Sequence, residues 1–302
     1  MPEVSLSTMW AKGRFSRMAE FAAKARELGF THVEPNASVS PKLLRELLKT
    51  GVPISSIHSP CPAVPSSRGI PVSSLSLSSP DTSQRTEAVS FTKKTIDLAA
   101  SVKARAIVLH MGEVPVDLSL RDRLYKLHDE GCAETREYRQ AREELVRQRI
   151  SLAHLYVDAA RDSLQELSKY GQEKGIMLGL ETRFHFNEIP NMDEMADLLD
   201  DVPGQEAGYW HDVGHAEVQQ QLGFSLHEEW LSRFKDRMVG IHLHDIRGIA
   251  DHHAPGEGNM NWEMIARYLP QGMVKVCEIG EWNDEHQMQG VVRFLQTKVI
   301  LD

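Results

Sequence analysis

Hydrophobic and polar positions follow two alternating periods along this chain. Short apolar runs typical of strands are each followed by a segment whose apolar residues recur every three or four positions, as on one face of a helix. This pattern predicts eight strands, at residues 4–9, 31–35, 53–58, 104–110, 176–181, 208–212, 238–244 and 274–279. It predicts helices at residues 15–28, 41–48, 86–101, 150–170, 191–199, 226–233, 262–269 and 287–296.

Strand and helix alternate along the whole chain, and no linker divides it. We therefore predict α/β architecture, with residues 1–302 forming a single (β/α)8 TIM barrel whose site lies at the carboxyl ends of the strands. An open doubly wound sheet is the alternative, but no glycine-rich phosphate loop follows the first strand. The segment 63–83, rich in Ser and Pro, is expected to be a loop ordered over the site.

Residues 119–174 are charged and helical almost throughout, which predicts a helical excursion after the fourth strand. The part from 134 to 149 is so polar that its faces are expected to be solvated, or packed on another subunit of a homo-oligomer. A solvated excursion is the simpler interpretation.

Composition narrows the classes of partner. The chain has 302 residues, of which 41% are hydrophobic and 25% charged, as in ordinary globular proteins. Its formal net charge of −9 argues against a nucleic-acid partner. No apolar run is long enough to cross a bilayer, so no membrane partner is expected. The cysteines Cys61, Cys132 and Cys277 are far apart, which favours a reducing, cytoplasmic location.

Candidate chemistry is densest in residues 240–258. His242 and His244 share one face of the predicted seventh strand, because side chains alternate along a strand. The loop that follows holds Asp245, Arg247, Asp251, His252 and His253. So many imidazoles and carboxylates in one short stretch favour metal binding or catalysis over a structural role.

Other predicted strands also end in residues that bind metals. These are His58, His110, Glu181, Asp212 with His215 three residues later, and Glu278. Any one of them could be a helix cap or half of a salt bridge. A buried carboxylate is costly unless it is paired or bound to a metal, so their joint position at one end of a barrel predicts a shared site.

These motifs resemble a known family. His110-Met111-Gly112, Leu180-Glu181, Asp212-Val213-Gly214-His215, His242-Leu243-His244-Asp245, the Asp251 loop before Gly256-Glu257-Gly258, and Glu278 are similar, in order, to the xylose isomerase-like barrel superfamily. That superfamily holds sugar isomerases and epimerases, inosose-processing enzymes, hydroxypyruvate isomerase and endonuclease IV. The resemblance covers nearly the whole chain, and it is specific for the superfamily rather than for a substrate.

The isomerase and epimerase branch implies one divalent ion, such as Mn, Zn, Co or Mg. By this resemblance the ligands are Glu181, Asp212, His242 and Glu278, and the two glutamates act as acid and base on opposite faces of the substrate. His58, His110, His215 and Arg247 are candidates for binding substrate oxygens, although Arg247 is equally compatible with a surface loop.

The endonuclease IV branch implies additional zinc ions. His58, His110, His215 and the pair Asp251 and His253 resemble its further ligands. The loop before Gly256 is one residue shorter than in that branch, so His252 is an alternative to His253. The sequence Ser-Pro-Cys-Pro after His58 lacks the bulky residues that endonuclease IV pushes into DNA, which favours a small sugar-like substrate.

The expected activity follows from the ligand set. A divalent ion that binds adjacent carbonyl and hydroxyl oxygens acidifies the C–H bond between them, and two carboxylates can remove and return that proton. We therefore expect an isomerase or epimerase that acts on a sugar, cyclitol or small hydroxy-ketone through an enediolate. An endonuclease IV-like multi-zinc phosphodiesterase and a non-catalytic sugar-binding barrel are the alternatives.

Overall fold

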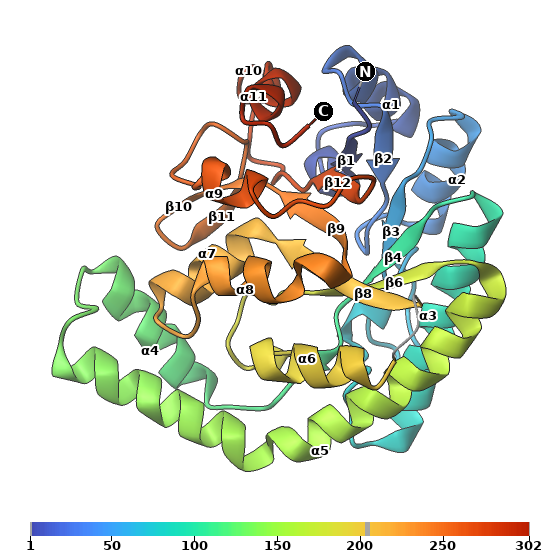
Figure 1. The fold of residues 1–302 in the computed structure, drawn as a ribbon. Helices are drawn as coiled ribbons and strands as arrows, with labels where there is room; N and C mark the ends of the chain where they lie inside the picture. The colour runs from blue at the N-terminus through green and yellow to red at the C-terminus, as the bar shows by residue number, and fades with distance from the viewer. Residues whose placement is uncertain (1, 203–205, 302) are drawn as a thin grey trace.

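Eight parallel strands form one sheet in this computed structural model, which describes residues 2–202 and 206–301. The strands are β1 (Ser5–Ser7), β2 (His32–Glu34), β3 (Ser56–His58), β4 (Ala106–Leu109), β6 (Met177–Glu181), β8 (Ala207–Asp212), β9 (Met238–Leu243) and β12 (Val274–Cys277). Their spatial order is β2-β1-β12-β9-β8-β6-β4-β3, and a parallel bridge between Val33 and Ile54 joins the two ends of the sheet. The predicted α/β barrel is confirmed, with strands somewhat shorter than the apolar runs (Figure 1).

Helices cover the outside of the barrel (Figure 1). They are α1 (Met18–Glu27), α2 (Pro41–Lys49), α3 (Thr82–Ser101), α4 (Leu118–Asp129), α5 (Arg136–Lys174), α6 (Met192–Asp200), α7 (Val213–Gln221), α8 (His227–Phe234), α9 (Trp262–Ala266), α10 (Glu285–Met288) and α11 (Val291–Thr297). The predicted closing helix is divided in two at Gly290, whose φ of +87° is not helical. Among the described residues, no helix is both long and apolar enough to cross a membrane.

The helix α7 was not predicted. Hydrophobic and polar residues are mixed around its surface, yet Val213, His215, Ala216 and Gln219 are all buried, so it lacks the one-sided apolar stripe that reveals a helix in a sequence. Its first turn is capped by Asp212, whose Oδ1 accepts the backbone N–H of His215 at 2.8 Å. A residue that ends a strand therefore also starts a helix.

A layer of side chains fills the barrel beneath the strand ends. Ala106, Val108, Trp210, Val274 and Val276 form this layer, and Trp210 is fully buried in it. Glycine gives the indole its room, because a Cβ on Gly240 would lie 2.1 Å from the ring. The ring of His242 packs against Trp210 with centroids 5.2 Å apart. The core thus supports one of the candidate ligands from below.

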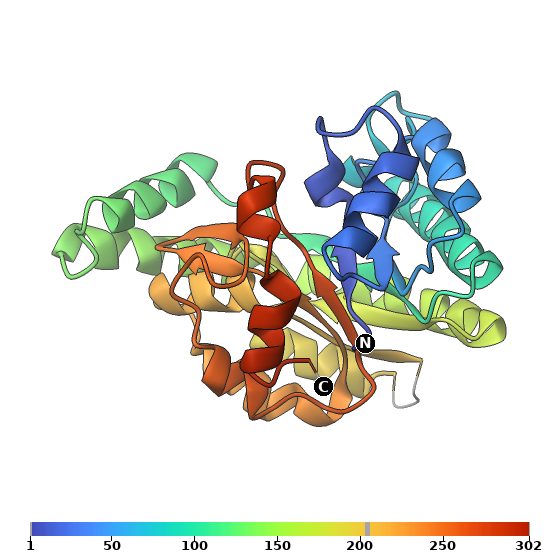
Figure 2. The same cartoon turned by 90° about the horizontal axis from the view of Figure 1, so that it is seen from above.

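The excursion after the fourth strand is a pair of helices, α4 and the 39-residue α5, which extends beyond the barrel in both ribbon views (Figures 1 and 2). Its polar segment 134–149 is largely exposed, as expected, but one face packs within the chain. Tyr138, Ala141 and Leu145 are buried with Leu124 of α4. Arg149 is 1% exposed, and its guanidinium binds the Glu194 carboxylate at 2.6 and 2.7 Å. A buried, paired arginine makes this segment part of the fold.

The Ser- and Pro-rich loop is ordered but lies beside the site rather than over it. Ser163 of α5 donates to the Leu77 carbonyl at 2.7 Å, and Ser76 and Ser78 pack against Gly112, which leaves no space for a Cβ. Gly112 belongs to β5 (Gly112–Glu113), which pairs with β7 (Glu188–Ile189). The central cavity described below has no lining residue from this loop.

Candidate metal centre and active site

Four of the predicted residues meet at the carboxyl ends of neighbouring strands. Glu181 ends β6, Asp212 ends β8, His242 lies in β9, and Glu278 follows β12. Each is buried, and one ligand atom from each lies within 4.8 Å of all the others. The His242 Nδ1 is 2.5 Å from Glu181 Oε1, 3.2 Å from Glu278 Oε2 and 3.5 Å from Asp212 Oδ2. We call these four residues the central cluster.

Glu34, which the sequence interpretation missed, orients His242. The Nε2 of His242 lies 3.1 Å from Glu34 Oε1, and the Ser56 hydroxyl donates to Glu34 Oε2 at 2.6 Å. When Nε2–H donates to Glu34, the Nδ1 lone pair faces the other three carboxylates. A second carboxylate behind a histidine is the usual support of a metal ligand. Its sequence signal was available, since Glu34 is the next-to-last residue of the predicted strand 31–35.

Asp212 is held in place by groups around its Oδ1 atom. Its Oδ1 lies 3.0 Å from His244 Nε2 and accepts the backbone N–H of His215. The His244 Nδ1 accepts the backbone N–H of His252 at 2.9 Å, so its Nε2 carries the proton that is donated to Asp212. Asp212 therefore presents Oδ2 to the central cluster.

Charge crowding at the central cluster suits a cation. Burial raises the pKa of Glu278 to about 8, with His242 opposing the rise and the carboxylates of Glu181 and Glu34 adding to it. Burial lowers the pKa of His242, but the neighbouring Glu278 and Glu34 carboxylates outweigh it and hold that pKa well above its usual value. Three buried carboxylates around one imidazole form a donor set that fits a divalent ion.

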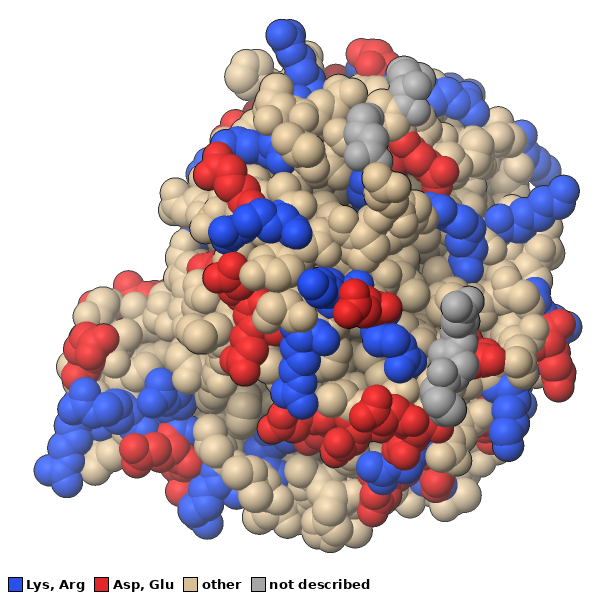
Figure 3. All heavy atoms as spheres, viewed as in Figure 1, with Lys and Arg blue, Asp and Glu red and all other residues tan. Residues whose placement is uncertain are grey.

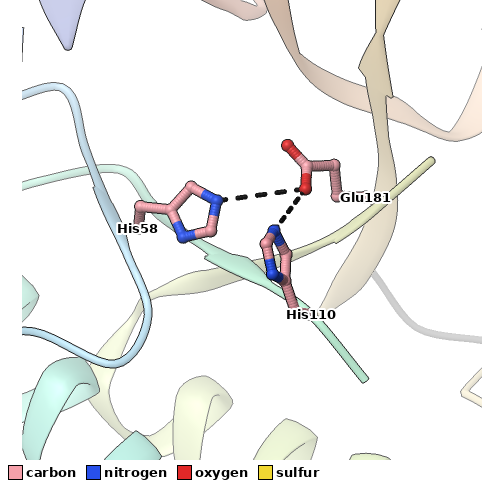
Figure 4. Close-up of side chains that lie close together, drawn as sticks. All are labelled: His58, His110 and Glu181. Carbon is pink, nitrogen blue, oxygen red and sulfur yellow. Dashed lines mark ion pairs between the residues drawn. The ribbon is translucent and has the colours of Figure 1, made fainter. Parts of the chain in front are cut away.

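A second group of metal-type ligands adjoins the first. His58 at the end of β3 and His110 after β4 both direct Nε2 toward Glu181 Oε2, at 3.9 and 2.6 Å (Figure 4). We call His58, His110 and Glu181 the histidine cluster. Burial, together with His110, lowers the pKa of His58 well below its usual value, so this ring is neutral.

Arg183 also contacts Glu181 and was not predicted. Its Nη1 donates to Glu181 Oε2, and its Nη2 donates to Glu188 Oε1 at 2.7 Å. The side chain is 7% exposed and lines the central cavity. Its place two residues after Glu181 gives no periodic signal, because the chain has already left the strand there.

The third group lies in the loop region. His215, Asp251 and His252, here the loop cluster, each offer one ligand atom to a common point. The His215 Nδ1 is 2.8 Å from the Thr182 carbonyl, and the His252 Nδ1 is 2.9 Å from the Glu278 carbonyl. Each ring therefore carries its proton on Nδ1 and turns the Nε2 lone pair toward Asp251 Oδ2, at 3.7 and 3.5 Å.

The structure brings His252, not His253, to this cluster. Both residues belong to β11 (Ala250–His253), which pairs with β10 (Asp245–Arg247) as a hairpin. Regular alternation along a strand would place Asp251 and His253 on one face and His252 on the other. His252 has a positive φ of +55°, which breaks this alternation, and its ring lies with Asp251 and His215. The shorter loop noted in the sequence is thus accommodated by His252.

Arg247 does not line the cavity, and its position matches a surface loop, one of the two interpretations that the sequence left open. Its side chain is 52% exposed, its Nε donates to the Glu257 carbonyl at 2.5 Å, and its Nη2 lies 3.1 Å from Glu257 Oε2. The hairpin turns it outward. The Asp245 carboxylate beside it accepts the backbone N–H groups of Gly256 and Met260, both at 2.9 Å, and so organises the loop.

All three clusters contribute residues to one cavity of about 220 Å³ at the rim of the barrel. Its lining consists of Met9, Asn36, Ala37, Ser38, His58, His110, Glu181, Arg183, His215, His252 and Glu278. A cavity of this size and polarity can hold a small polar molecule beside the central cluster.

Comparisons with known proteins agree with this architecture. A curated relative, the uncharacterized protein y4fM of Sinorhizobium fredii, is 25% identical over 270 residues, which span 81% of this chain and 74% of that protein. Among solved structures, D-psicose 3-epimerase from Clostridium cellulolyticum is 15% identical with a TM-score of 0.66, and the alignment covers 98% of this chain and 99% of that one.

Two further solved structures share the fold. The 3-keto-D-glucoside 4-epimerase YcjR from E. coli is 14% identical, with a TM-score of 0.68, over 98% of this chain and 100% of that one. A putative xylose isomerase from Rhodospirillum rubrum is 17% identical, with a TM-score of 0.67, over 100% of both chains. The model of the family described as xylose isomerase-like TIM barrel matches residues 22–298. With most of its length matched, the chain belongs to the xylose isomerase-like TIM barrel family.

Proposed function

We propose that this protein is a divalent-metal-dependent isomerase or epimerase of a sugar, a cyclitol or a small hydroxy-ketone. The observation that carries the proposal is the central cluster: three carboxylates and one imidazole, all buried, meet beside a polar cavity. The similar solved structures support it, because they include sugar epimerases, one of them solved with D-tagatose.

The proposed chemistry divides between the ion and the chain. Glu181, Asp212, His242 and Glu278 would hold the ion, which when bound supplies the positive charge that stabilises an enediolate. Glu181 ends β6 and Glu278 follows β12, and these two strands are separated in the sheet by β8 and β9. A substrate carbon between them can lose a proton to one carboxylate and regain it from the other.

The rest of the cavity would bind the substrate. His58, His110 and His215 line it and offer ring nitrogens to hydroxyl oxygens, in keeping with the roles expected from the sequence. Arg183 adds a buried cation on the same wall. Arg247 has no part in this arrangement because its guanidinium pairs with Glu257.

Surface charge and the cysteines bear on the proposed partners and location. On the face drawn in Figure 3, basic and acidic side chains are interspersed and form no continuous basic surface, which supports a small substrate rather than nucleic acid. All three cysteines are free, two of them buried, and this supports the proposed reducing, cytoplasmic location.

The direct test is proton exchange. The purified protein, loaded in turn with Mn, Co, Mg or Zn, is incubated in deuterated water with a panel of ketoses, cyclitols and hydroxy-ketones. We expect deuterium to enter at a carbon next to a carbonyl of one class of substrate. The exchange should disappear with chelator and in Glu278→Gln, and it should persist in Arg247→Ala. Tight sugar binding without exchange under any metal would instead indicate a non-catalytic barrel.

A multi-zinc phosphodiesterase is the second candidate, and the loop cluster favours it. Two imidazoles with fixed protons and one carboxylate can hold an ion beyond the one at the central cluster. Metal content separates the two functions, because the phosphodiesterase is expected to hold about three zinc ions and enediolate chemistry needs about one ion. Nanomolar, salt-sensitive binding of duplex DNA with an abasic site would place this candidate first.

A further inference from the structure

Glu181 is shared between two clusters, and its two oxygens have different neighbours. Oε1 faces the central cluster, where His242 Nδ1 lies 2.5 Å away. Oε2 faces the histidine cluster, where the Nε2 atoms of His58 and His110 converge on it (Figure 4). The geometry of the histidine cluster by itself is that of a metal site with three protein ligands.

Arg183 changes what that cluster can bind. Its Nη1 donates to the same Oε2 atom, while His110 Nε2 lies 2.6 Å from it. A carboxylate oxygen has two lone pairs, and these two donors occupy both of them. The guanidinium is always charged, and Glu188 holds its Nη2 at 2.7 Å, so it is locked in position.

We propose that Arg183 is a built-in substitute for a second metal ion. Its guanidinium neutralises the outer side of Glu181 and excludes a divalent ion from the histidine cluster, so that Glu181 serves the central cluster through Oε1 alone. Arg183 is then a positioning residue for the metal ligand, His110 contacts Glu181 rather than a metal, and His58 is available to substrate rather than to a metal.

The loop cluster provides an internal contrast. Its carboxylate, on Asp251, faces only the imidazoles of His215 and His252 among the ion pairs of the described residues, and no arginine or lysine reaches it. The loop cluster therefore offers two imidazole lone pairs and a carboxylate oxygen that pairs with no arginine or lysine of the described residues. Imidazole and carboxylate ligands are thus available to an ion in the loop cluster, whereas Arg183 blocks them in the histidine cluster.

Metal content tests this inference. The protein and its variants are stripped with chelator, reloaded with Zn or Mn, freed of excess ion on a desalting column, and their ions per chain are counted by mass spectrometry. Replacing both His58→Ala and His110→Ala in the native background should leave the count unchanged. The charge-neutral double variant Arg183→Met with Glu188→Gln should gain one ion per chain, and adding the two histidine substitutions to it should remove that ion again.

The conservative variant Arg183→Lys should keep the native count, since an ammonium group can occupy the same position. Each count is a difference between variants, so ions at the loop cluster cancel. The inference is wrong if the histidine substitutions alone remove an ion, or if the folded Arg183→Met, Glu188→Gln protein gains none. Should that double variant not fold by circular dichroism, the histidine substitutions in the native background decide.

The inference rests on the proposed function only in assuming an ion at the central cluster. Failure of the two is distinguishable: a protein that retains no ion in any variant contradicts the proposed function, whereas an ion that depends on His58 and His110 contradicts the role of Arg183.

Discussion

The central cluster contains two glutamates, Glu181 and Glu278, and their surroundings differ. Glu181 contacts Arg183 and His110 through one oxygen and His242 through the other. Glu278 contacts His242 at 3.2 Å, and no arginine or lysine of the described residues lies within ion-pair distance of it. Burial opposes ionisation of both. At Glu181 the imidazoles of His110 and His242 outweigh it and hold the pKa well below its usual value, whereas the pKa of Glu278 is raised to about 8.

This difference indicates that the two glutamates of one ligand set can have different roles. A carboxylate whose two oxygens are both held by neighbouring groups, as in Glu181, is a ligand with little capacity to accept a further proton. A carboxylate without an arginine beside it, as in Glu278, can accept and return a substrate proton more easily. We therefore expect Glu278 to do most of the proton transfer and Glu181 to act mainly as a ligand. The competing case is a symmetrical pair in which each glutamate serves one face of the substrate.

The largest effect is expected for Glu278→Gln. An amide cannot accept the substrate proton, so turnover and proton exchange should fall by about 10²–10⁴-fold with metal saturating. Metal affinity should change less, since the amide oxygen still coordinates. The measurement is exchange in deuterated water at several metal concentrations. Retention of full turnover would remove Glu278 from the mechanism.

Glu181→Gln should have a smaller catalytic effect, toward the lower end of that range, about 10²-fold. Its loss of metal affinity should be greater than that of Glu278→Gln, because the loss of the carboxylate charge also weakens the ion pair with Arg183 that positions this ligand. Calorimetric metal titration and exchange rates on both variants give the comparison. If the two variants lose exchange equally and only net inversion distinguishes them, the symmetrical pair is the correct description.

Glu188→Gln tests the support of Arg183 through stability. Burial raises the pKa of the Glu188 carboxyl, but Arg183 outweighs it and lowers that pKa to about 2 from an ordinary value of 4.5. A carboxyl whose pKa is lower in the folded than in the unfolded state stabilises the fold at pH values above the unfolded pKa. This stabilisation, about 3 kcal/mol, is lost as the pH falls toward 2.

The free energy of unfolding of the native protein should therefore exceed that of Glu188→Gln at pH 6, and the difference should shrink between pH 4.5 and 2. Urea denaturation at a series of pH values measures it. A difference that does not depend on pH would show that Arg183 and Glu188 are not ionically coupled.

The smallest effect is expected for Arg247→Ala, the matched arginine outside the cavity. An exposed ion pair contributes about 0–1 kcal/mol, so stability and exchange rate should stay close to the native values. Thermal melts and the deuterium assay check both. A strong loss of substrate binding in this variant would restore the role that the sequence suggested for Arg247 and weaken the contrast with Arg183.

The sequence by itself determined the barrel and the central cluster. Alternating apolar periods predict strand and helix without knowledge of contacts, and parallel strands of a barrel all end at the same rim. Residues that end strands, such as Glu181 and Asp212, must then lie near one another. Glu34 obeyed the same rule and could have been found.

Only the tertiary structure decided which neighbours these residues have. Whether His252 or His253 lies with Asp251 depends on the backbone of His252, whose φ of +55° breaks the alternation of the strand. Arg183 turns inward and Arg247 turns outward because the fold of the loops brings different carboxylates to them. Arg183 pairs with Glu181 and Glu188, and Arg247 pairs with Glu257. Side-chain direction and pairing outside regular elements arise from long-range packing and electrostatics, which leave no periodic trace in the sequence.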